Sequence, residues 1–185
     1  ITAYESMPRL VGSEMCIRDR VLDRVSRDYK QIKVYSTLSP IPGFARLLHG
    51  LSTTGGSNNH AVADAIATIS DRDDLSRIFT NRSWIRDTAA VEQAREPLLL
   101  LCAHYLLETK RGISALDPVA NFHLSNGASI ERLNWMADTS KNGQQQSVGL
   151  MVNYRYRLKD IESNHEAYYT DGKIICTKAV SGVLK

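Results

Sequence analysis

The spacing of apolar residues predicts two helices near the beginning of the chain, with an extended segment between them. Val21–Gln31 and Phe44–Leu51 both place apolar side chains at close to helical spacing. Ile32–Tyr35 lies between them, is rich in β-branched and aromatic residues, and favours a strand. Two prolines and a glycine follow Ser39. Prolines lack the N–H that a strand donates and glycine permits a turn, so the strand is expected to end near Ser39.

The middle of the chain is predicted to be mostly helical. Ser52–Asn59 (STTGGSNN) is a polar loop rich in turn residues, and helical patterns then continue as far as Thr109. Pro97 is expected to open a new helix, PLLLLCAHYLLE, because proline is well tolerated at the first helical position. This segment is apolar on nearly all sides, which indicates that it is buried.

The pattern changes again in the last part of the chain. Arg111–Gly127 contains two glycines and a proline and is predicted to be irregular chain or short turns. Ile130–Ala137 and Val148–Leu158 favour strands, and the polar stretch Ser140–Gln146, with its Asn-Gly pair, is expected to join them as a hairpin. A shorter strand is expected at Lys173–Thr177.

Composition points to one ordinary globular domain. Of the 185 residues 43% are hydrophobic and 23% are charged, as in typical soluble domains. The formal net charge of +3 is small and the basic residues are dispersed among acidic ones, so no nucleic-acid partner is expected.

Cysteine usage and hydropathy bear on the compartment. The 3 cysteines lie far apart, show no CxxC spacing and leave one over after pairing, which favours a reducing compartment without structural zinc. The longest apolar stretch, Pro97–Leu107, is shorter than the roughly 20 residues that cross a bilayer, and the first residues lack a secretion-signal layout. We therefore expect a cytoplasmic protein with no membrane partner.

Two segments hold a polar side chain rigidly among apolar neighbours. Ser39 lies between a strand and two prolines, and His123 lies in the turn-rich segment Asp117–Gly127. Such groups are candidates for catalysis. A serine before proline is more often only a turn residue, however, and a lone histidine with apolar neighbours is more often structural. Neither segment matches GxSxG, so a hydrolase nucleophile elbow is not indicated.

Other candidate sites are weaker. His104 and Glu108 are four residues apart on one predicted helical face, which could bring two metal ligands together. No third ligand has a helpful spacing, so a buried hydrogen bond is the better interpretation and no metal is expected. Cys102 is expected to be a small core residue because nothing nearby would lower the pKa of its thiol. The glycines form neither GxGxxG nor a P-loop.

Three blocks of the sequence, STLSPIPGF, LCAHYLLETKRGISALDPVANFHLSNGASIERLNWMADTS and GLMVNYRYRL, resemble signature blocks of the malonyl-CoA decarboxylase family. The resemblance runs from about Val21 to about Tyr168 and is least distinctive over Ser52–Arg95. It implies an α+β fold: an acetyltransferase-like (GNAT-type) mixed sheet with flanking helices and a helical insertion, preceded in the family by a separate helical domain. The N-terminal strands of that sheet are expected to be missing here.

The resemblance also implies an activity, the cleavage of malonyl-CoA to acetyl-CoA and carbon dioxide. Ser39 and His123 match the family's catalytic serine and histidine, and Tyr156 is expected to line the same substrate-binding pocket. Malonyl-CoA is therefore the expected partner, and the full-length protein is expected to be a homo-oligomer.

The residue types suit that chemistry. Loss of carbon dioxide leaves an enolate, whose charge must be stabilised and whose carbon must be protonated. The thioester carbonyl is itself an electron sink, so neither a metal nor an organic cofactor is expected. His123, expected to titrate near neutrality, would donate the proton. Ser39 would bind the malonyl carboxylate or the imidazole without becoming acylated.

The first 20 residues depart from the family pattern. ITAYESMPRLVGSEMCIRDR stands where the family has a coenzyme-A loop, and its MPRLVGSEMCIRDR portion is similar to translated sequencing-adaptor read-through. We expect residues 1–20 to be a non-native leader and residues 21–185 to be the C-terminal part of the catalytic domain, a truncated fragment lacking part of the coenzyme-A site. Two alternatives stay open: an acyl-CoA acyltransferase, and a non-catalytic acyl-CoA-binding or interaction module.

Overall fold

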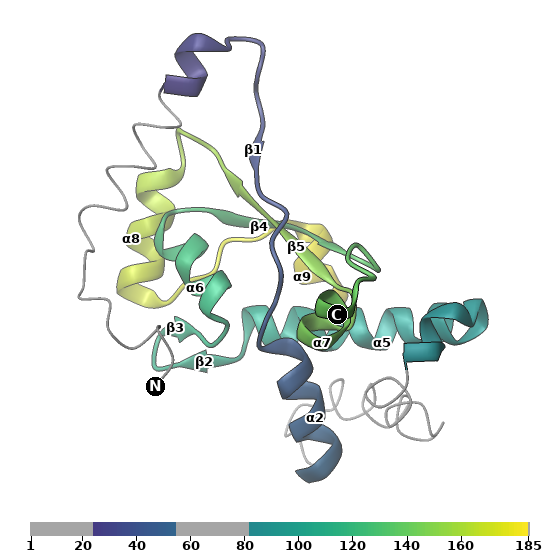
Figure 1. Ribbon diagram of the computed structural model, residues 1–185. Coiled ribbons are helices and arrows are strands. Elements are labelled where there is room, and N and C mark those ends of the chain that lie inside the picture. Colours follow the sequence, from purple (N-terminus) through teal and green to yellow (C-terminus); the bar gives the residue numbers. More distant parts are fainter. Residues whose placement is uncertain (1–23, 55–81, 185) are drawn as a thin grey trace, which may run out of the picture.

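A computed structural model describes residues 24–54 and 82–184 of the chain. At its centre is a three-stranded antiparallel sheet with the strand order β1-β5-β4 (Figure 1). Its strands are β1 (Tyr35–Ser36), β4 (Ser129–Asn134) and β5 (Met151–Tyr156). The expected α+β class is confirmed. Apart from one isolated parallel bridge, the pairing among the described strands is antiparallel rather than mixed.

Helices surround this sheet, and a small ribbon connects two of them. In Figure 1, α6 and α8 lie together beside the sheet, while α5 runs across its lower end. The helices labelled in Figure 1 are α2 (Phe44–Thr54), α5 (Thr88–Leu107), α6 (Pro118–Ser125), α7 (Lys141–Ser147), α8 (Ile161–Asp171) and α9 (Lys178–Ser181). The 3-10 turns are η1 (Arg82–Arg86) and η2 (Gly182–Leu184), and the ribbon is β2 (Lys110–Arg111) with β3 (Ser114–Ala115).

Strand β5 places alternate side chains in the core. Val152, Tyr154 and Tyr156 are buried, whereas the residues between them are only half-buried, because successive side chains of a strand point to opposite faces. The buried face belongs to the same apolar cluster as Leu98 and Leu106 of α5. Burying one such leucine contributes about 1.5–3 kcal/mol, so this cluster fixes the sheet against α5.

The first predicted elements are largely confirmed, with shifted ends. Residues 24–28 are helical within the predicted helix Val21–Gln31. The predicted strand Ile32–Tyr35 shares only Tyr35 with β1, which begins three residues later than predicted, and a bridge from Ser39 to Val152 continues the pairing beyond it. Helix α2 continues to Thr54, so the first residues of the predicted loop are helical. Residues 55–59 of that loop, and residues 60–81 of the predicted helical stretch after it, lie outside the described residues.

Helix α5 passes through Pro97, so the prediction of a new helix beginning there is wrong. The helix begins instead after Asp87, whose carboxylate Oδ1 accepts hydrogen bonds from the backbone N–H groups of Ala89 (3.0 Å) and Ala90 (3.2 Å). Proline removes one backbone hydrogen bond from a helix interior. Here the buried apolar second half holds the helix continuous. Among the described residues, no helix is long and apolar enough to cross a membrane.

Two segments predicted as irregular chain are helices. Arg111–Gly127 contains α6, which begins with Pro118 at a first-turn position after the capping residue Asp117. The predicted turn Ser140–Gln146 is α7, capped by a hydrogen bond from Gly143 N–H to Ser140 Oγ (3.1 Å). Both corrections have the same cause, because a cap stabilises a short helix that turn-forming residues conceal.

The predicted strands of the last third are confirmed but shorter. β5 lies within Val148–Leu158, and β4 begins one residue before Ile130–Ala137 and ends inside it; the two strands pair antiparallel. The expected strand Lys173–Thr177 is wrong, since it contributes only an isolated parallel bridge between Cys176 and Ile130. Helix α8 was not predicted. Only Ile161 and Tyr168 of its residues are buried, so its sequence carries little helical periodicity.

Replacing Gly127 with alanine is expected to destabilise the fold. Gly127 has φ +76° and its Cα faces the backbone carbonyl of Ile161, where a methyl group would overlap α8. We expect Gly127→Ala to lower the free energy of unfolding by about 3 kcal/mol, measured by urea unfolding. Gly112→Ala is the control, because Gly112 has φ +63° but open space around it, and should cost about 1 kcal/mol. Equal losses would contradict the proposed contact with α8.

Candidate functional site

Ser39 is held on both sides by backbone pairing with β5. Its N–H donates to the carbonyl of Val152 (2.9 Å), and the N–H of Val152 donates to the carbonyl of Ser39 (2.9 Å). The side chain is buried, with 6% of its surface exposed. The prediction that Ser39 lies at a strand end is therefore confirmed, and the backbone aims its hydroxyl into the structure.

His123 lies in the last turn of α6, not in irregular chain as predicted. Its imidazole is 9% exposed. The ring of Tyr154, from β5, stacks on it with a centroid distance of 4.3 Å and an interplanar angle of 21°. The neighbouring Phe122 ring meets the imidazole edge-on, with a centroid distance of 5.2 Å. These aromatic contacts restrict the orientation of the imidazole.

The fold brings the three predicted site residues together. The Oγ of Ser39 lies 3.2 Å from Nε2 of His123, and Nδ1 of His123 lies 2.7 Å from the hydroxyl of Tyr156. Ser39 Oγ also lies 2.9 Å from Oγ1 of Thr37, a residue that sequence reasoning missed. Thr37, Ser39, His123 and Tyr156 thus form one line of hydrogen bonds across the strands and α6.

Burial sets the charge state of this group. Desolvation lowers the pKa of His123 to about 4, so the imidazole is neutral at pH 7, in contrast to the expected titration near neutrality. A neutral imidazole has one N–H donor and one acceptor nitrogen. Each hydroxyl in the line can also donate or accept. The hydrogen bonds can therefore all run from Tyr156 towards Thr37 or all in reverse, and the line can pass a proton in either direction.

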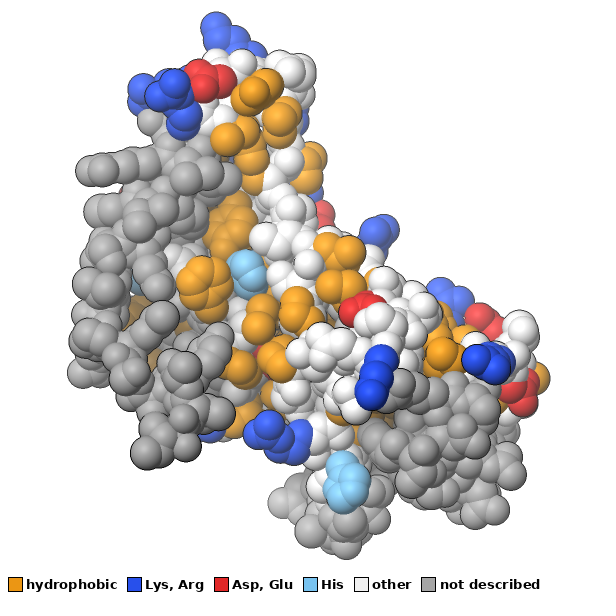
Figure 2. Space-filling view, in the orientation of Figure 1, with side chains coloured by type: hydrophobic (Ala, Val, Ile, Leu, Met, Phe, Trp, Pro, Cys, Tyr) orange, Lys and Arg blue, Asp and Glu red, His pale blue; other side chains and the backbone are white. Residues whose placement is uncertain are grey.

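The residues that precede Ser39 and His123 in the chain are exposed and apolar. Leu38 is 55% exposed and Phe122 is 48% exposed. Figure 2 shows hydrophobic side chains gathered over the middle of this face. Apolar side chains beside a few buried polar groups are the usual composition of a small-molecule site.

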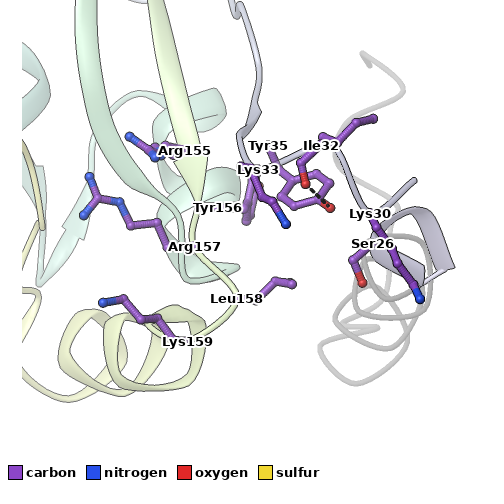
Figure 3. A pocket seen from close by; sticks show the side chains of 10 residues that line it. All are labelled: Ser26, Lys30, Ile32, Lys33, Tyr35, Arg155, Tyr156, Arg157, Leu158 and Lys159. Carbon is purple, nitrogen blue, oxygen red and sulfur yellow. Dashed lines mark hydrogen bonds between the residues drawn. The ribbon is translucent and has the colours of Figure 1, made fainter. Parts of the chain in front are cut away.

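A basic cavity lies beside Tyr156. It has a volume of about 720 Å³ and is lined by the ends of β1 and β5 and by the chain before β1. Arg155 forms an ion pair with Glu131 (2.7 Å), and Arg157 lies 3.7 Å from the same carboxylate. Figure 3 shows the Tyr156 ring between the arginine-bearing strand end and the lysine-bearing segment before β1. Its basic lining residues are Lys30, Lys33, Arg155, Arg157 and Lys159.

The weaker candidates from the sequence fall outside this group. Burial, and secondarily the charge of Asp117, raise the pKa of the Cys102 thiol, and Cys102 is fully buried, so its interpretation as a core residue is confirmed. The backbone N–H of Glu108 donates to the backbone carbonyl of His104 (2.8 Å), while Glu108 itself is exposed. The expected buried hydrogen bond between these two residues is therefore wrong. Within the part of the chain that the structure describes, no three His, Cys, Asp or Glu side chains could hold a metal ion.

Asp117 is a buried acid that sequence reasoning missed. It is 1% exposed and lies at the start of the helix that carries His123. Desolvation raises the pKa of its carboxyl group, while hydrogen bonds from Ala120, Gly43, Val119 and Tyr105 act in the opposite direction. The Asp-Pro pair before an apolar run is the signal that could have identified both the helix and its buried cap.

The neutral state of His123 predicts a pH-dependent stability. The pKa of His123 is about 4 in the folded protein and 6.5 in the unfolded chain. Between pH 4 and pH 6.5 the unfolded chain therefore binds a proton that the folded protein does not. This contribution to the free energy of unfolding is complete above pH 6.5 and is lost as the pH falls to 4. We expect His123→Gln to reduce the slope of stability against pH in that window, measured by urea unfolding. The exposed His49→Gln is the control, and an unchanged slope in His123→Gln would contradict the buried neutral state.

Several known proteins are similar to this chain. The family profile described as malonyl-CoA decarboxylase C-terminal domain matches residues 13–185. Among curated proteins, "Malonyl-CoA decarboxylase, mitochondrial" of Anser anser anser is 42% identical over 161 residues, which cover 80% of this chain and 32% of that protein. The protein of the same name from Mus musculus is 38% identical over 159 residues, with coverages of 80% and 32%. The chain thus spans about a third of the length of the curated relatives it matches.

Solved structures of the same name are also similar. Malonyl-CoA decarboxylase from Rhodopseudomonas palustris has a TM-score of 0.77 and 36% identity, covering 90% of this chain and 37% of that one. The enzyme from Agrobacterium vitis has a TM-score of 0.78 and 33% identity, covering 96% and 42%. The family profile matches residues 13–185, a range that includes Ser39, His123 and Tyr156. The chain therefore belongs to the malonyl-CoA decarboxylase C-terminal domain family.

Proposed function

We propose that this domain catalyses the decarboxylation of malonyl-CoA to acetyl-CoA and carbon dioxide. The observation that carries the proposal is the buried hydrogen-bonded line of Ser39, His123 and Tyr156 in a domain of this family. The relatives that match the chain carry the name of this activity. Ser39 and His123 are the proposed catalytic residues, and Tyr156 is the proposed substrate-site residue that holds His123.

The reaction needs a proton and stabilisation of negative charge. The bond between the α-carbon and the carboxylate breaks, carbon dioxide leaves, and the electron pair forms the enolate of the thioester. The α-carbon then takes up one proton, which water finally replaces, giving the acetyl thioester. Ser39 and His123 would supply the hydrogen bond to the developing enolate and the proton. The thioester accepts the electron pair, so the proposed mechanism uses no organic cofactor and no metal.

The neutral histidine decides how the proton moves. With a pKa of about 4, His123 carries no charge at pH 7 and holds its single ring proton on one nitrogen. If Nε2 carries that proton, it faces Ser39, while Nδ1 accepts from the Tyr156 hydroxyl (2.7 Å). The Ser39 hydroxyl would give its proton to the carbon and regain one from Nε2. Nδ1 would at the same time take the Tyr156 proton, which water replaces, so the imidazole stays neutral. A neutral group also avoids holding the malonyl carboxylate by a strong ion pair in the ground state, which would slow its departure.

The basic cavity beside Tyr156 suits the rest of the substrate. Coenzyme A carries several phosphate charges at the end remote from the thioester. Lys30, Lys33 and Lys159 line the cavity together with two arginines. Ammonium groups bind phosphate by charge-assisted hydrogen bonds. We infer that this cavity receives anionic parts of the substrate while the thioester lies beside Ser39 and His123.

We also infer that the sheet is part of an acetyltransferase-like (GNAT-type) sheet. Strand β1 pairs with β5 on one side and is an edge of the described sheet. An unpaired edge can accept further strands, and the preceding strands of such a fold would pair there. The leader at residues 1–20, the domain at 21–185, a cytoplasmic location and a homo-oligomeric full-length protein stay predictions. The curated relatives are named mitochondrial.

Removing either proposed catalytic group should nearly abolish turnover. We expect Ser39→Ala and His123→Ala each to lower kcat for malonyl-CoA by about 10²–10⁴-fold in the full-length protein, because each removes a step of proton transfer. Release of labelled carbon dioxide measures the rate. His49→Ala is the control, since His49 is exposed on α2 and is expected to leave turnover unchanged.

The same assay separates decarboxylation from acyl transfer. The wild-type protein should release carbon dioxide from malonyl-CoA without any acceptor amine. Transfer of an acyl group to an added amine, with no carbon dioxide released, would favour the acyltransferase alternative. Binding of malonyl-CoA with no reaction of either kind would favour a non-catalytic module.

Removing the Tyr156 hydroxyl should slow the reaction without preventing binding. Tyr156→Phe leaves Nδ1 of His123 without the hydrogen bond of 2.7 Å. We expect kcat to fall by about tenfold, which corresponds to the net value of one hydrogen bond of roughly 1.4 kcal/mol. Tyr169→Phe is the matched control, because Tyr169 is 70% exposed. A Tyr156→Phe protein with wild-type kcat would remove Tyr156 from the mechanism.

A further inference from the structure

The carboxylate of Asp117 holds the beginning of the helix that carries His123. Its Oδ1 accepts hydrogen bonds from the backbone N–H groups of Val119 (3.0 Å) and Ala120 (2.9 Å). These two bonds cap α6 and fix its first turn. Because α6 is only two turns long, fixing its first turn also fixes the position of His123 in its last turn.

The other oxygen of the same carboxylate holds the turn that follows Ser39. Oδ2 accepts from the backbone N–H of Gly43 (3.3 Å) and lies 3.4 Å from the hydroxyl of Tyr105, which donates to it. Gly43 is joined to Ser39 through a short segment with two prolines, whose fixed φ angles make the connection stiff. One carboxylate is therefore bonded to both segments that meet at the Ser39–His123 hydrogen bond.

The packing around this carboxylate leaves little room for adjustment. A methyl group on Gly43 would overlap the hydroxyl of Tyr105 and approach Oδ2 of Asp117 to 3.5 Å. The ring of Tyr105 also packs on Phe44, with a centroid distance of 5.9 Å. The close approach of the turn, α5 and the cap of α6 thus depends on a residue without a side chain.

A buried carboxylate is costly unless hydrogen bonds compensate for the lost water. Asp117 receives four such bonds, whereas a helix of this length needs only the two at its cap. Asp87 caps α5 with the same two bonds to its second and third following N–H groups, and it is exposed. The two extra bonds of Asp117 are not needed to cap α6. They join the start of α6 to Gly43 and to Tyr105.

We propose that Asp117 is a positioning residue that fixes the distance between the Ser39 hydroxyl and the His123 imidazole. It does so by bonding at once to the start of α6 and to the turn after Ser39. The proposal rests on the proposed function of this site. It concerns the rate of the chemical step, since neither oxygen of Asp117 touches the Ser39–His123 line.

The experiment compares Asp117→Ala with Asp87→Ala in the full-length protein. Both variants lose a cap, but only Asp117→Ala loses the link to Gly43. A misplacement of about 1 Å in reacting groups can cost 10²-fold in rate, so we expect kcat of Asp117→Ala to fall by about that factor, with KM changed less than threefold. Asp87→Ala should keep kcat within about twofold after correction for the folded fraction. Equal losses of kcat in the two variants would overturn the proposal.

Asp117→Asn tests whether both oxygens of the carboxylate are needed. Asparagine has one acceptor oxygen, so if that oxygen keeps the cap of α6, the amide nitrogen faces the Gly43 N–H and cannot accept from it. We expect kcat to fall by about as much as in Asp117→Ala, with KM unchanged. An Asp117→Asn protein with the kcat of the wild type would contradict the positioning role assigned to these hydrogen bonds.

A measurement that does not depend on enzymatic turnover tests the positioning role of Asp117 separately from the proposed decarboxylase function. Amide hydrogen exchange at Gly43 should quicken in Asp117→Ala and stay unchanged in Asp87→Ala. Tyr105→Phe, which keeps the carboxylate and its cap, supplies a second variant if Asp117→Ala fails to fold. It should also quicken exchange at Gly43, by a smaller factor. A wild-type protein without decarboxylase activity would refute the proposed function, whereas unchanged exchange at Gly43 in every folded variant would refute the link itself.

Discussion

The site depends on the pairing of β5 with the chain segment that ends at Ser39. β5 is the middle strand of the described sheet, and it pairs with β1 on one side and β4 on the other. Beyond β1, two backbone hydrogen bonds of 2.9 Å between Ser39 and Val152 continue this pairing. Alternation along β5 then puts Tyr154 and Tyr156 on the buried face. One register therefore places Ser39, the ring that stacks on the imidazole and the hydroxyl that bonds to it. A shift of one residue would turn all of them away from His123.

Burial has opposite effects on the two titratable groups near this strand. It lowers the pKa of His123, because the charged form of an imidazole is a cation, and it raises that of Asp117, because its charged form is an anion. His123 has only hydroxyl groups and aromatic rings among its described contacts, so nothing offsets desolvation and the ring is neutral. Asp117 has four donors, which favour its anionic form. The imidazole is thus uncharged, while the Asp117 carboxyl group holds backbone N–H groups one step away from the Ser39–His123 line.

Local sequence patterns predicted those strands and helices whose own side chains favour that secondary structure. The segments predicted as strands at Ile130–Ala137 and Val148–Leu158 correspond to β4 and β5, and the prolines after Ser39 correctly indicated a strand end. Two short helices, α6 and α7, were concealed because their few residues are typical of turns, and their caps decide the outcome. Pro97 misled for the opposite reason, since tertiary packing of the apolar half of α5 overrides the local preference of proline to begin a helix. The pairing of Tyr156 with His123 joins residues 33 positions apart, which no local pattern encodes.

The two aspartate caps show which part of the site local sequence cannot predict. Asp87 and Asp117 each precede a helix and each accept from the second and third following N–H groups, so their local sequence signal is the same. Only the fold distinguishes them, because the turn after Ser39 and Tyr105 of α5 both reach the second oxygen of Asp117. The acid acts on the site through these two donors, which lie far from it in sequence. A glycine at position 43 makes that approach possible, and its importance arises from the space occupied by Tyr105 rather than from any conformation of its own.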